Sequence, residues 1–108
     1  LVDAEALAAM KATAVLVNVG RGPVVDEAAL AAALEEKRIR GAALDVFETE
    51  PLPDESPLRG MDNVVITSHY AGATPHYDER ALDIFLDNLQ RYRFGQPLRN
   101  VVDKRLGY

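Results

Sequence analysis

The stretch VLVNVGRGPVVDE, residues 15–27, joins an apolar run to the start of a helix and decides how the chain around it folds. The run over residues 14–19 is β-branched, uncharged and interrupted only by Asn18, which is typical of a strand buried on both faces. Asp26 then stands where a helix N-cap is needed, and the helix is expected to reach about Arg38. A strand, a tight loop and a helix in this order predict one unit of a parallel α/β sheet.

The same alternation continues on both sides of this stretch. A short helix is expected over residues 3–10, a second buried strand over residues 42–47 and a third strand over residues 64–68. Gly41 is expected to end the helix before the second strand. An acidic, proline-rich loop, residues 48–63, separates the second strand from the third. Strands joined through helices or long crossovers favour parallel pairing with right-handed connections, so the predicted fold class is α/β.

The longest predicted helix comes after the third strand. Thr74 is expected to cap it, Pro75 to begin it, and Phe94 to lie near its end, before Gly95. Its apolar residues recur at helical spacing and predict one face that packs against another element.

Composition limits the classes of function. The chain has 108 residues, a formal net charge of −5 and no cysteine. The acidic balance argues against nucleic acid and against an anionic membrane surface as partners. The lack of cysteine excludes disulfides, thiolate metal sites and a cysteine nucleophile, and it permits a reducing compartment. No apolar run has the length of a membrane span. Because the first residue is Leu1 and the chain opens on the flank of a helix, we expect a piece of a longer polypeptide.

Three chemically active side chains each follow one predicted strand. Arg21 follows the first, Glu50 the second and His69 the third. In open α/β sheets ligands bind beyond the carboxyl ends of the strands, so these residues are expected at one edge, with Glu50 and His69 within hydrogen-bonding reach. Taken singly, Arg21 is compatible with a surface turn, Glu50 with a solvated acidic loop and His69 with a structural histidine. Their common placement favours a site.

This trio suits a 2-oxo or 2-hydroxy acid. Arg21 can grip a carboxylate with its planar fork, and His69 can exchange the hydroxyl proton near neutral pH. Glu50, if paired with His69, would hold the ring and keep it a competent acid. Gly20 and Gly22 are expected to let the backbone approach a flat ligand and to aim the arginine between them. No metal site is predicted, and His76 is expected on the surface of a helix.

Three blocks of the sequence, VLVNVGRGPVVDEAAL, GAALDVFETEPLP and NVVITSHYAGAT, resemble the C-terminal signature blocks of the D-isomer-specific 2-hydroxyacid dehydrogenases. The resemblance covers essentially the whole chain. It implies the C-terminal half of a Rossmann-like doubly wound parallel sheet, with a long helix and a C-terminal tail. Residues 1–94 would be a partial dinucleotide-binding domain, and residues 95–108 a tail that packs on a substrate domain.

The resemblance also implies roles for single residues. Arg21 matches the substrate-binding arginine of the family, Glu50 its catalytic glutamate and His69 its acid–base histidine. Ser68 stands where the family has proline. The cofactor-binding residues implied in the same way are Val19, Gly20, Arg21, Asp45, His69, Ala71 and Gly72. Asp45 matches the aspartate that hydrogen-bonds the nicotinamide carboxamide.

The function implied is NAD- or NADP-dependent hydride transfer between a small 2-oxo acid and its D-2-hydroxy acid, in a cytoplasmic enzyme that is a homodimer when intact. The chain lacks the G-x-G-x-x-G phosphate loop, so the 108 residues alone are expected to be inactive. An alternative is a non-catalytic, corepressor-like interaction protein on the same scaffold. Formate dehydrogenase, a second alternative, has glutamine where this chain has Glu50.

Overall fold

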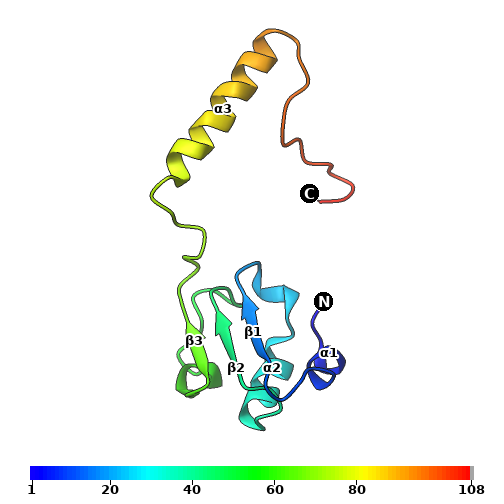
Figure 1. Ribbon diagram of the computed structural model, residues 1–108, viewed down its shortest axis with the longest axis vertical. Helices are drawn as coiled ribbons and strands as arrows, with labels where there is room; N and C mark the ends of the chain where they lie inside the picture. Colours follow the sequence, from blue (N-terminus) through cyan, green and yellow to red (C-terminus); the bar gives the residue numbers. More distant parts are fainter. Residues whose placement is uncertain (108) are drawn as a thin grey trace. The chain divides into compact units, whose positions relative to one another are not determined.

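The computed structural model describes residues 1–107 and divides into two compact units, one of residues 1–71 and one that starts at Gly72. The helices and strands of the first unit are α1 (Ala4–Ala8), β1 (Val15–Asn18), α2 (Glu27–Glu35), β2 (Gly41–Leu44) and β3 (Val64–Ile66), with 3₁₀ turns at Gly22–Val24 and Pro57–Gly60 (Figure 1). The second unit contains α3 (Tyr77–Arg93). Contacts group α3 with the tail, and the domain boundary expected between residues 94 and 95 stays a prediction.

The strands of the first unit form a parallel sheet in the order β1-β2-β3, which confirms the α/β class. Leu16 pairs with Ala42, which in turn pairs with Val64. Gly41 opens β2 rather than ending a helix, so that expectation is wrong. A Cβ at Gly41 would lie 2.5 Å from the carbonyl oxygen of Asn63, and glycine is therefore the residue that lets β2 start this close to its neighbour.

The two helices of the first unit are shorter than the sequence predicts. α1 ends at Ala8 rather than Met10, and α2 ends at Glu35 rather than Arg38. Lys37 has a φ of 56°, a left-handed conformation that a helix cannot continue through. Asp3 and Asp26 cap the two helices as expected, because the side chain of each accepts a hydrogen bond from the third amide that follows it.

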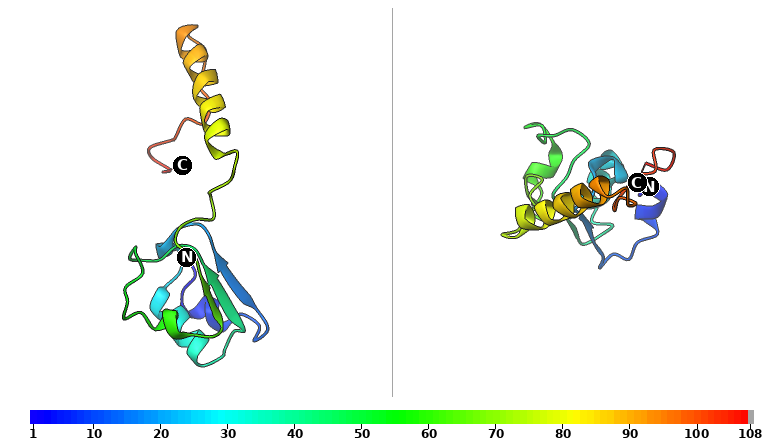
Figure 2. Two further views of the ribbon diagram at one scale, coloured as in Figure 1. Left: turned by 90° about the vertical axis from the view of Figure 1, so that its left-hand side faces the viewer. Right: turned by 90° about the horizontal axis from the view of Figure 1, so that it is seen from above.

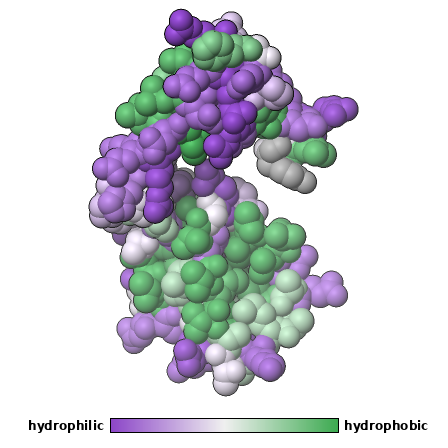
Figure 3. All heavy atoms as spheres, turned by 45° about the horizontal axis from the view of Figure 1, so that its top comes forward, coloured by the Kyte–Doolittle hydropathy of each residue, from purple (hydrophilic) through white to green (hydrophobic). Residues whose placement is uncertain are grey.

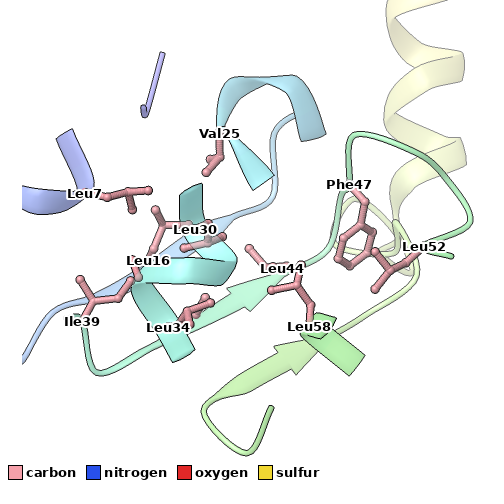
Figure 4. Close-up of a cluster of buried hydrophobic side chains, with 12 residues drawn as sticks. Leu7, Leu16, Val25, Leu30, Leu34, Ile39, Leu44, Phe47, Leu52 and Leu58 are labelled. Atoms are coloured by element: carbon pink, nitrogen blue, oxygen red, sulfur yellow. The ribbon is translucent and has the colours of Figure 1, made fainter. Parts of the chain in front are cut away.

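The hydrophobic core of the first unit lies between one face of the sheet and the two helices. Leu7 of α1 and Leu30 and Leu34 of α2 pack with Leu16 of β1 and Leu44 of β2 (Figure 4). Each of these side chains is buried. Burying one leucine contributes about 1.5–3 kcal/mol, so α2, with two, is held mainly by this contact rather than by the helix propensity of its alanines.

The opposite face of the sheet is open. Val17 of β1 is 64% exposed and Val65 of β3 is 63% exposed, while Leu16 and Asn18 are buried. The prediction that residues 14–19 are buried on both faces is therefore wrong for the described residues. Successive side chains of a strand point to opposite faces, and α1 and α2 both cover the same one. Figure 3 shows apolar residues gathered over the surface of this unit.

α3 forms the second unit together with the tail that follows it (Figure 2). It begins at Tyr77, two residues later than the predicted start at Pro75. Thr74 is not the N-cap, because its carbonyl accepts a hydrogen bond from the Tyr77 amide in a turn that precedes the helix. Gly95, with a φ of 63°, ends the helix as predicted.

The tail is fastened to α3 by polar contacts. The Asn88 side chain accepts a hydrogen bond from the backbone N–H of Arg99 at 2.8 Å and donates one to its carbonyl at 3.1 Å. Asp87 accepts from both Arg91 and Arg99. The apolar residues of α3 are exposed or partly exposed within the described chain. No helix among residues 1–107 combines the length and apolarity that crossing a bilayer requires.

Candidate active site

The candidate site lies where the chain leaves the carboxyl ends of β2 and β3. β2 ends at Leu44 and β3 at Ile66, earlier than predicted, and the residues that follow carry polar groups. The Nδ1 atom of His69 lies 2.7 Å from Oε2 of Glu50, which confirms the expected contact. An ionised carboxylate only accepts hydrogen bonds, so Nδ1 is the donor and Nε2 is left for another partner.

The carboxylate of Glu50 is held at both of its oxygens. Oε1 accepts a hydrogen bond from the backbone N–H of Phe47 at 3.0 Å, while Oε2 faces His69. The hydrogen bond from His69, then the one from Phe47, lower the pKa of Glu50 below its ordinary value, and the positive charge of Arg21 adds to the effect. Glu50 therefore stays ionised and can orient the imidazole over a wide pH range.

Arg21 follows β1, and its positive charge makes the smallest of the contributions that lower the pKa of Glu50. The Nη1 group of Arg21 donates to the carbonyl of Gly20 at 2.7 Å. The arginine lies in extended backbone, with φ −143° and ψ 144°. One cation, one carboxylate and one imidazole thus come from the ends of three neighbouring strands, as the order of the sheet requires.

Asn18 shapes the loop that carries Arg21, a role that the sequence analysis missed. Its Oδ1 accepts from the N–H of Gly20, and its Nδ2 donates to the carbonyl of Arg21, both at 3.1 Å. Asn18 is buried at the end of β1. The signal was present in the sequence, because a single amide inside an apolar strand needs buried hydrogen-bond partners.

The two glycines that flank Arg21 differ in their surroundings: the role expected for Gly22 is wrong, and the approach of a flat ligand to Gly20 stays a prediction. A Cβ at Gly22 would lie 1.9 Å from the carbonyl oxygen of Phe47, so Gly22 allows the β1 loop to pack against the β2 loop. At Gly20 a Cβ would meet only the Asn18 side chain, at 3.6 Å, which is an ordinary contact.

Asp45 is 3% exposed and ties together the segment that carries His69. Its carboxylate accepts hydrogen bonds from the hydroxyl of Thr67 and from the amides of Tyr70 and Ala71. The Thr67 bond, followed by the two amides, lowers the pKa of Asp45. A carboxylate offers about four acceptor positions, so roughly one is left for a ligand amide.

A pocket of about 270 Å³ opens beside the Glu50–His69 pair. It is lined by Asp45, Phe47, Glu50, Pro51, Leu52, Arg59, Ile66, Thr67, Ser68 and His69. Arg59 was not anticipated, since nothing in an acidic loop singles it out. Its Nε donates to the carbonyl of Pro53 at 2.9 Å, and its Nη2 donates to the carbonyl of Leu52. These two hydrogen bonds stabilise the loop between β2 and β3.

The remaining residues expected at the cofactor are exposed. Val19 is 59% exposed beyond the end of β1, next to the uncovered Cα of Gly20. Ala71 and Gly72 are also exposed. An apolar side chain, an open glycine and a buried carboxylate with a spare acceptor position suit a flat ring that carries an amide.

His76 pairs with a residue of its own unit. Its Nδ1 lies 3.0 Å from Oε2 of Glu79 at the start of α3. Among residues 1–107 no group of three or more histidine, aspartate or glutamate side chains is arranged to hold a metal ion.

Comparison with known proteins identifies the family. A sequence model of a protein family, described as D-isomer specific 2-hydroxyacid dehydrogenase, NAD binding domain, matches residues 1–71. Glyoxylate reductase from Thermofilum pendens is 46% identical over 106 residues, which cover 98% of this chain and 31% of that protein. This chain spans about a third of the length of the curated relatives that it matches.

Solved structures agree. The D-isomer specific 2-hydroxyacid dehydrogenase from Xanthobacter autotrophicus Py2, in complex with NADPH and MES, is 50% identical with a TM-score of 0.89, and the match covers 97% of this chain and 43% of that one. An NADPH-dependent glyoxylate/hydroxypyruvate reductase from Sinorhizobium meliloti, in complex with NADP and sulfate, is 37% identical with a TM-score of 0.88. That match covers 99% of this chain and 35% of the reductase chain. The sheet that brings Glu50 to His69 is therefore that of an NAD-binding domain, and the chain belongs to the D-isomer specific 2-hydroxyacid dehydrogenase family.

Proposed function

We propose that this chain supplies the acid–base centre of an NAD- or NADP-dependent oxidoreductase that interconverts a small 2-oxo acid and its D-2-hydroxy acid. The observation that carries the proposal is the 2.7 Å contact between Nδ1 of His69 and Oε2 of Glu50 at the carboxyl end of a parallel sheet. An exposed imidazole held by an ionised carboxylate is an acid–base device, and it favours catalysis over a non-catalytic interaction protein.

Each side chain has a defined task in this reaction. Arg21 binds the carboxylate of the substrate through its planar guanidinium, which also draws electron density from the adjacent carbonyl. His69, with Nδ1 held by Glu50, donates a proton from Nε2 to the carbonyl oxygen in reduction and accepts it back in oxidation. Glu50 stabilises the protonated imidazole and keeps the ring oriented.

The cofactor is proposed to lie along the carboxyl ends of β1 and β2. The residues proposed to hold its nicotinamide end are Val19, Gly20, Arg21, Asp45, His69, Ala71 and Gly72. When bound, the nicotinamide supplies or takes up the hydride at the substrate carbon. The spare acceptor position on Asp45 suits the carboxamide N–H. Relatives solved with NADPH or NADP support a nicotinamide dinucleotide as the cofactor.

The finer parts of the proposal concern the whole enzyme. We propose that it is a cytoplasmic homodimer and that its partner is a small 2-oxo or 2-hydroxy acid rather than nucleic acid or membrane. The net charge of −5 supports the proposal that nucleic acid and membrane are not partners. The lack of cysteine is compatible with a reducing compartment such as the cytoplasm.

A chimera tests the proposal in a complete enzyme. The 108 residues replace the matching segment of the Sinorhizobium meliloti reductase, which is described as NADPH-dependent. We expect NADPH oxidation with glyoxylate, and a loss of about 10²–10⁴-fold in kcat for His69→Gln, with the NADPH dissociation constant little changed. His76→Gln is the matched control, because it alters the second histidine outside the site, and it is expected to retain activity.

Two results would contradict the proposal. One is a folded His69→Gln chimera that keeps the kcat of its parent. The other is a parent chimera that binds NADPH and folds cooperatively but reduces neither glyoxylate nor hydroxypyruvate.

A further inference from the structure

Asp45 makes contact with four of the five residues in the segment that carries the catalytic histidine. The hydroxyl of Thr67 and the amide of Tyr70 (2.7 Å) donate to its Oδ1, and the amide of Ala71 donates to its Oδ2 at 2.8 Å. The amide of His69 donates to its backbone carbonyl, also at 2.7 Å. A single residue beyond β2 thus accepts hydrogen bonds from four residues of this segment.

These bonds enclose an unusual backbone conformation. His69 has a φ of 53°, in the left-handed region that residues with a β-carbon disfavour. Its side chain is 49% exposed, so packing does not hold the residue there. The hydrogen bonds on either side of it do, since Thr67 and Tyr70 are fixed to the same carboxylate oxygen. Removing them would leave His69 free to return to an ordinary conformation, with its ring turned from Glu50.

Asp45 is itself firmly placed. It is buried at the end of β2, and its own amide donates to the carbonyl of Asn18 at 3.0 Å. Two residues further along, the amide of Phe47 fixes Glu50. Both members of the acid–base pair are thus held by the short segment from Asp45 to Phe47, which sets the distance between them.

We propose that Asp45 and Thr67 are positioning residues, which hold His69 in the left-handed conformation that aims its Nδ1 at Glu50. This rests on the acid–base role proposed for His69, and it goes beyond the contact with the nicotinamide carboxamide that the family resemblance implies for Asp45. Three of about four acceptor positions on the carboxylate already serve the His69 segment, and that contact would use the fourth. The hydroxyl of Thr67 bonds Asp45 and not His69 itself, so in this proposal it acts on His69 through Asp45.

The test uses Thr67→Val, which keeps the shape of the side chain and removes its hydroxyl, and Thr67→Ser, which keeps the hydroxyl. Both are made in the chimera and compared with the parent chimera by amide hydrogen exchange and by ¹⁵N NMR of the imidazoles, in which the His69 signal is identified by its loss in His69→Gln. His76, the second histidine of this chain, serves as an internal reference. Neither measurement needs substrate or turnover, and a failure here is therefore distinct from a loss of activity in the chimera.

For Thr67→Val we expect the amides of Tyr70 and Ala71 to exchange about tenfold faster, because a hydrogen bond to a charged acceptor is lost. We also expect the His69 imidazole to move from the Nδ1-protonated form toward a mixture of tautomers, with His76 unchanged. Thr67→Ser should restore both signals. An unaltered His69 spectrum in Thr67→Val would overturn the proposal. So would a failure of Thr67→Ser to rescue, or exchange that rises equally across β1 and β2, because Thr67 would then act on overall stability alone.

Discussion

The Cα of Gly22 faces the backbone of Phe47 so closely that a β-carbon there would lie 1.9 Å from the Phe47 carbonyl oxygen. This approach brings the loop after β1 against the loop after β2, the two loops that carry Arg21 and Glu50. The amide of Phe47 also holds Glu50. The packing of one glycine therefore bears on the geometry of the whole site.

Gly22→Ala is expected to destabilise the protein by about 1–3 kcal/mol or more, because the β-carbon meets backbone that cannot rotate away. Chemical denaturation of the chimera measures the effect. Gly20→Ala is the matched control, since its β-carbon would meet only a side-chain oxygen at 3.6 Å, and it should change stability by less than about 0.5 kcal/mol. Equal losses in the two variants would show that the Gly22–Phe47 contact is not the constraint.

Arg21→Lys is expected to lower kcat/KM for the 2-oxo acid by about 10- to 150-fold in the chimera, the loss that corresponds to one charged hydrogen bond. Lysine keeps the charge but not the planar fork that grips a carboxylate. Steady-state kinetics with glyoxylate measure the effect. Arg38→Lys, on an exposed residue that pairs with Glu36, is the control and should leave kcat/KM unchanged. If the Arg21→Lys chimera keeps the kcat/KM of its parent, the substrate-binding role proposed for Arg21 is wrong.

The stability of the first unit should depend on pH through Asp45. The pKa of Asp45 is lowered in the folded protein from an ordinary 3.8, chiefly by the Thr67 hydroxyl and then by the amides of Tyr70 and Ala71. A lowered folded-state pKa adds stability above the unfolded-state value and loses it as the pH falls through the folded one. Stability should therefore decline from about pH 4 downward.

Urea titrations of the chimera between pH 6 and pH 3 measure this decline. Asp45→Asn should make the protein less stable at pH 6 and flatten the decline, because one carboxylate whose pKa is lowered by folding is gone. Asp62→Asn changes an exposed aspartate and should preserve the pH dependence of the unaltered chain. A decline of the same steepness in Asp45→Asn would assign it to other carboxylates.

The open face of the sheet and the edge strand β1 should make the isolated chain associate. Val15 and Val17 of β1 are exposed, and β1 is an edge strand in the described structure. An uncharged, β-branched edge without proline pairs readily with other chains. Light scattering should show oligomers or aggregates of the unaltered chain, and NADH titration should show no cofactor binding.

Val17→Lys is expected to reduce that association, because it places a charge on the open face. Ala32→Lys, on the exposed side of α2, is the matched control and should leave association unchanged. If the unaltered chain is a monodisperse, cooperatively unfolding monomer that binds NADH at micromolar levels, it contradicts the expected association and the expected lack of cofactor binding.

Much of the site could be read from local pattern. The strand that ends at Asn18, the cap at Asp26 and the residue types of Arg21, Glu50 and His69 are local properties, and parallel topology alone brings strand ends to one edge. The contact between Glu50 and His69, which lie 19 positions apart, follows from that rule. Their chemical identity favoured acid–base chemistry on a 2-oxo or 2-hydroxy acid, and the family resemblance added the nicotinamide cofactor.

By itself, the sequence determined the parallel α/β order and the three side chains that the proposed chemistry needs. Only the tertiary structure decided that Gly22 packs against Phe47, that one face of β1 is open, and that Asp45 accepts hydrogen bonds from the residues around His69, whose φ is positive. These features depend on which backbone groups from distant segments meet. Hydrophobic periodicity reports which side of an element is apolar, but it carries no information about the backbone or helix that lies against that side.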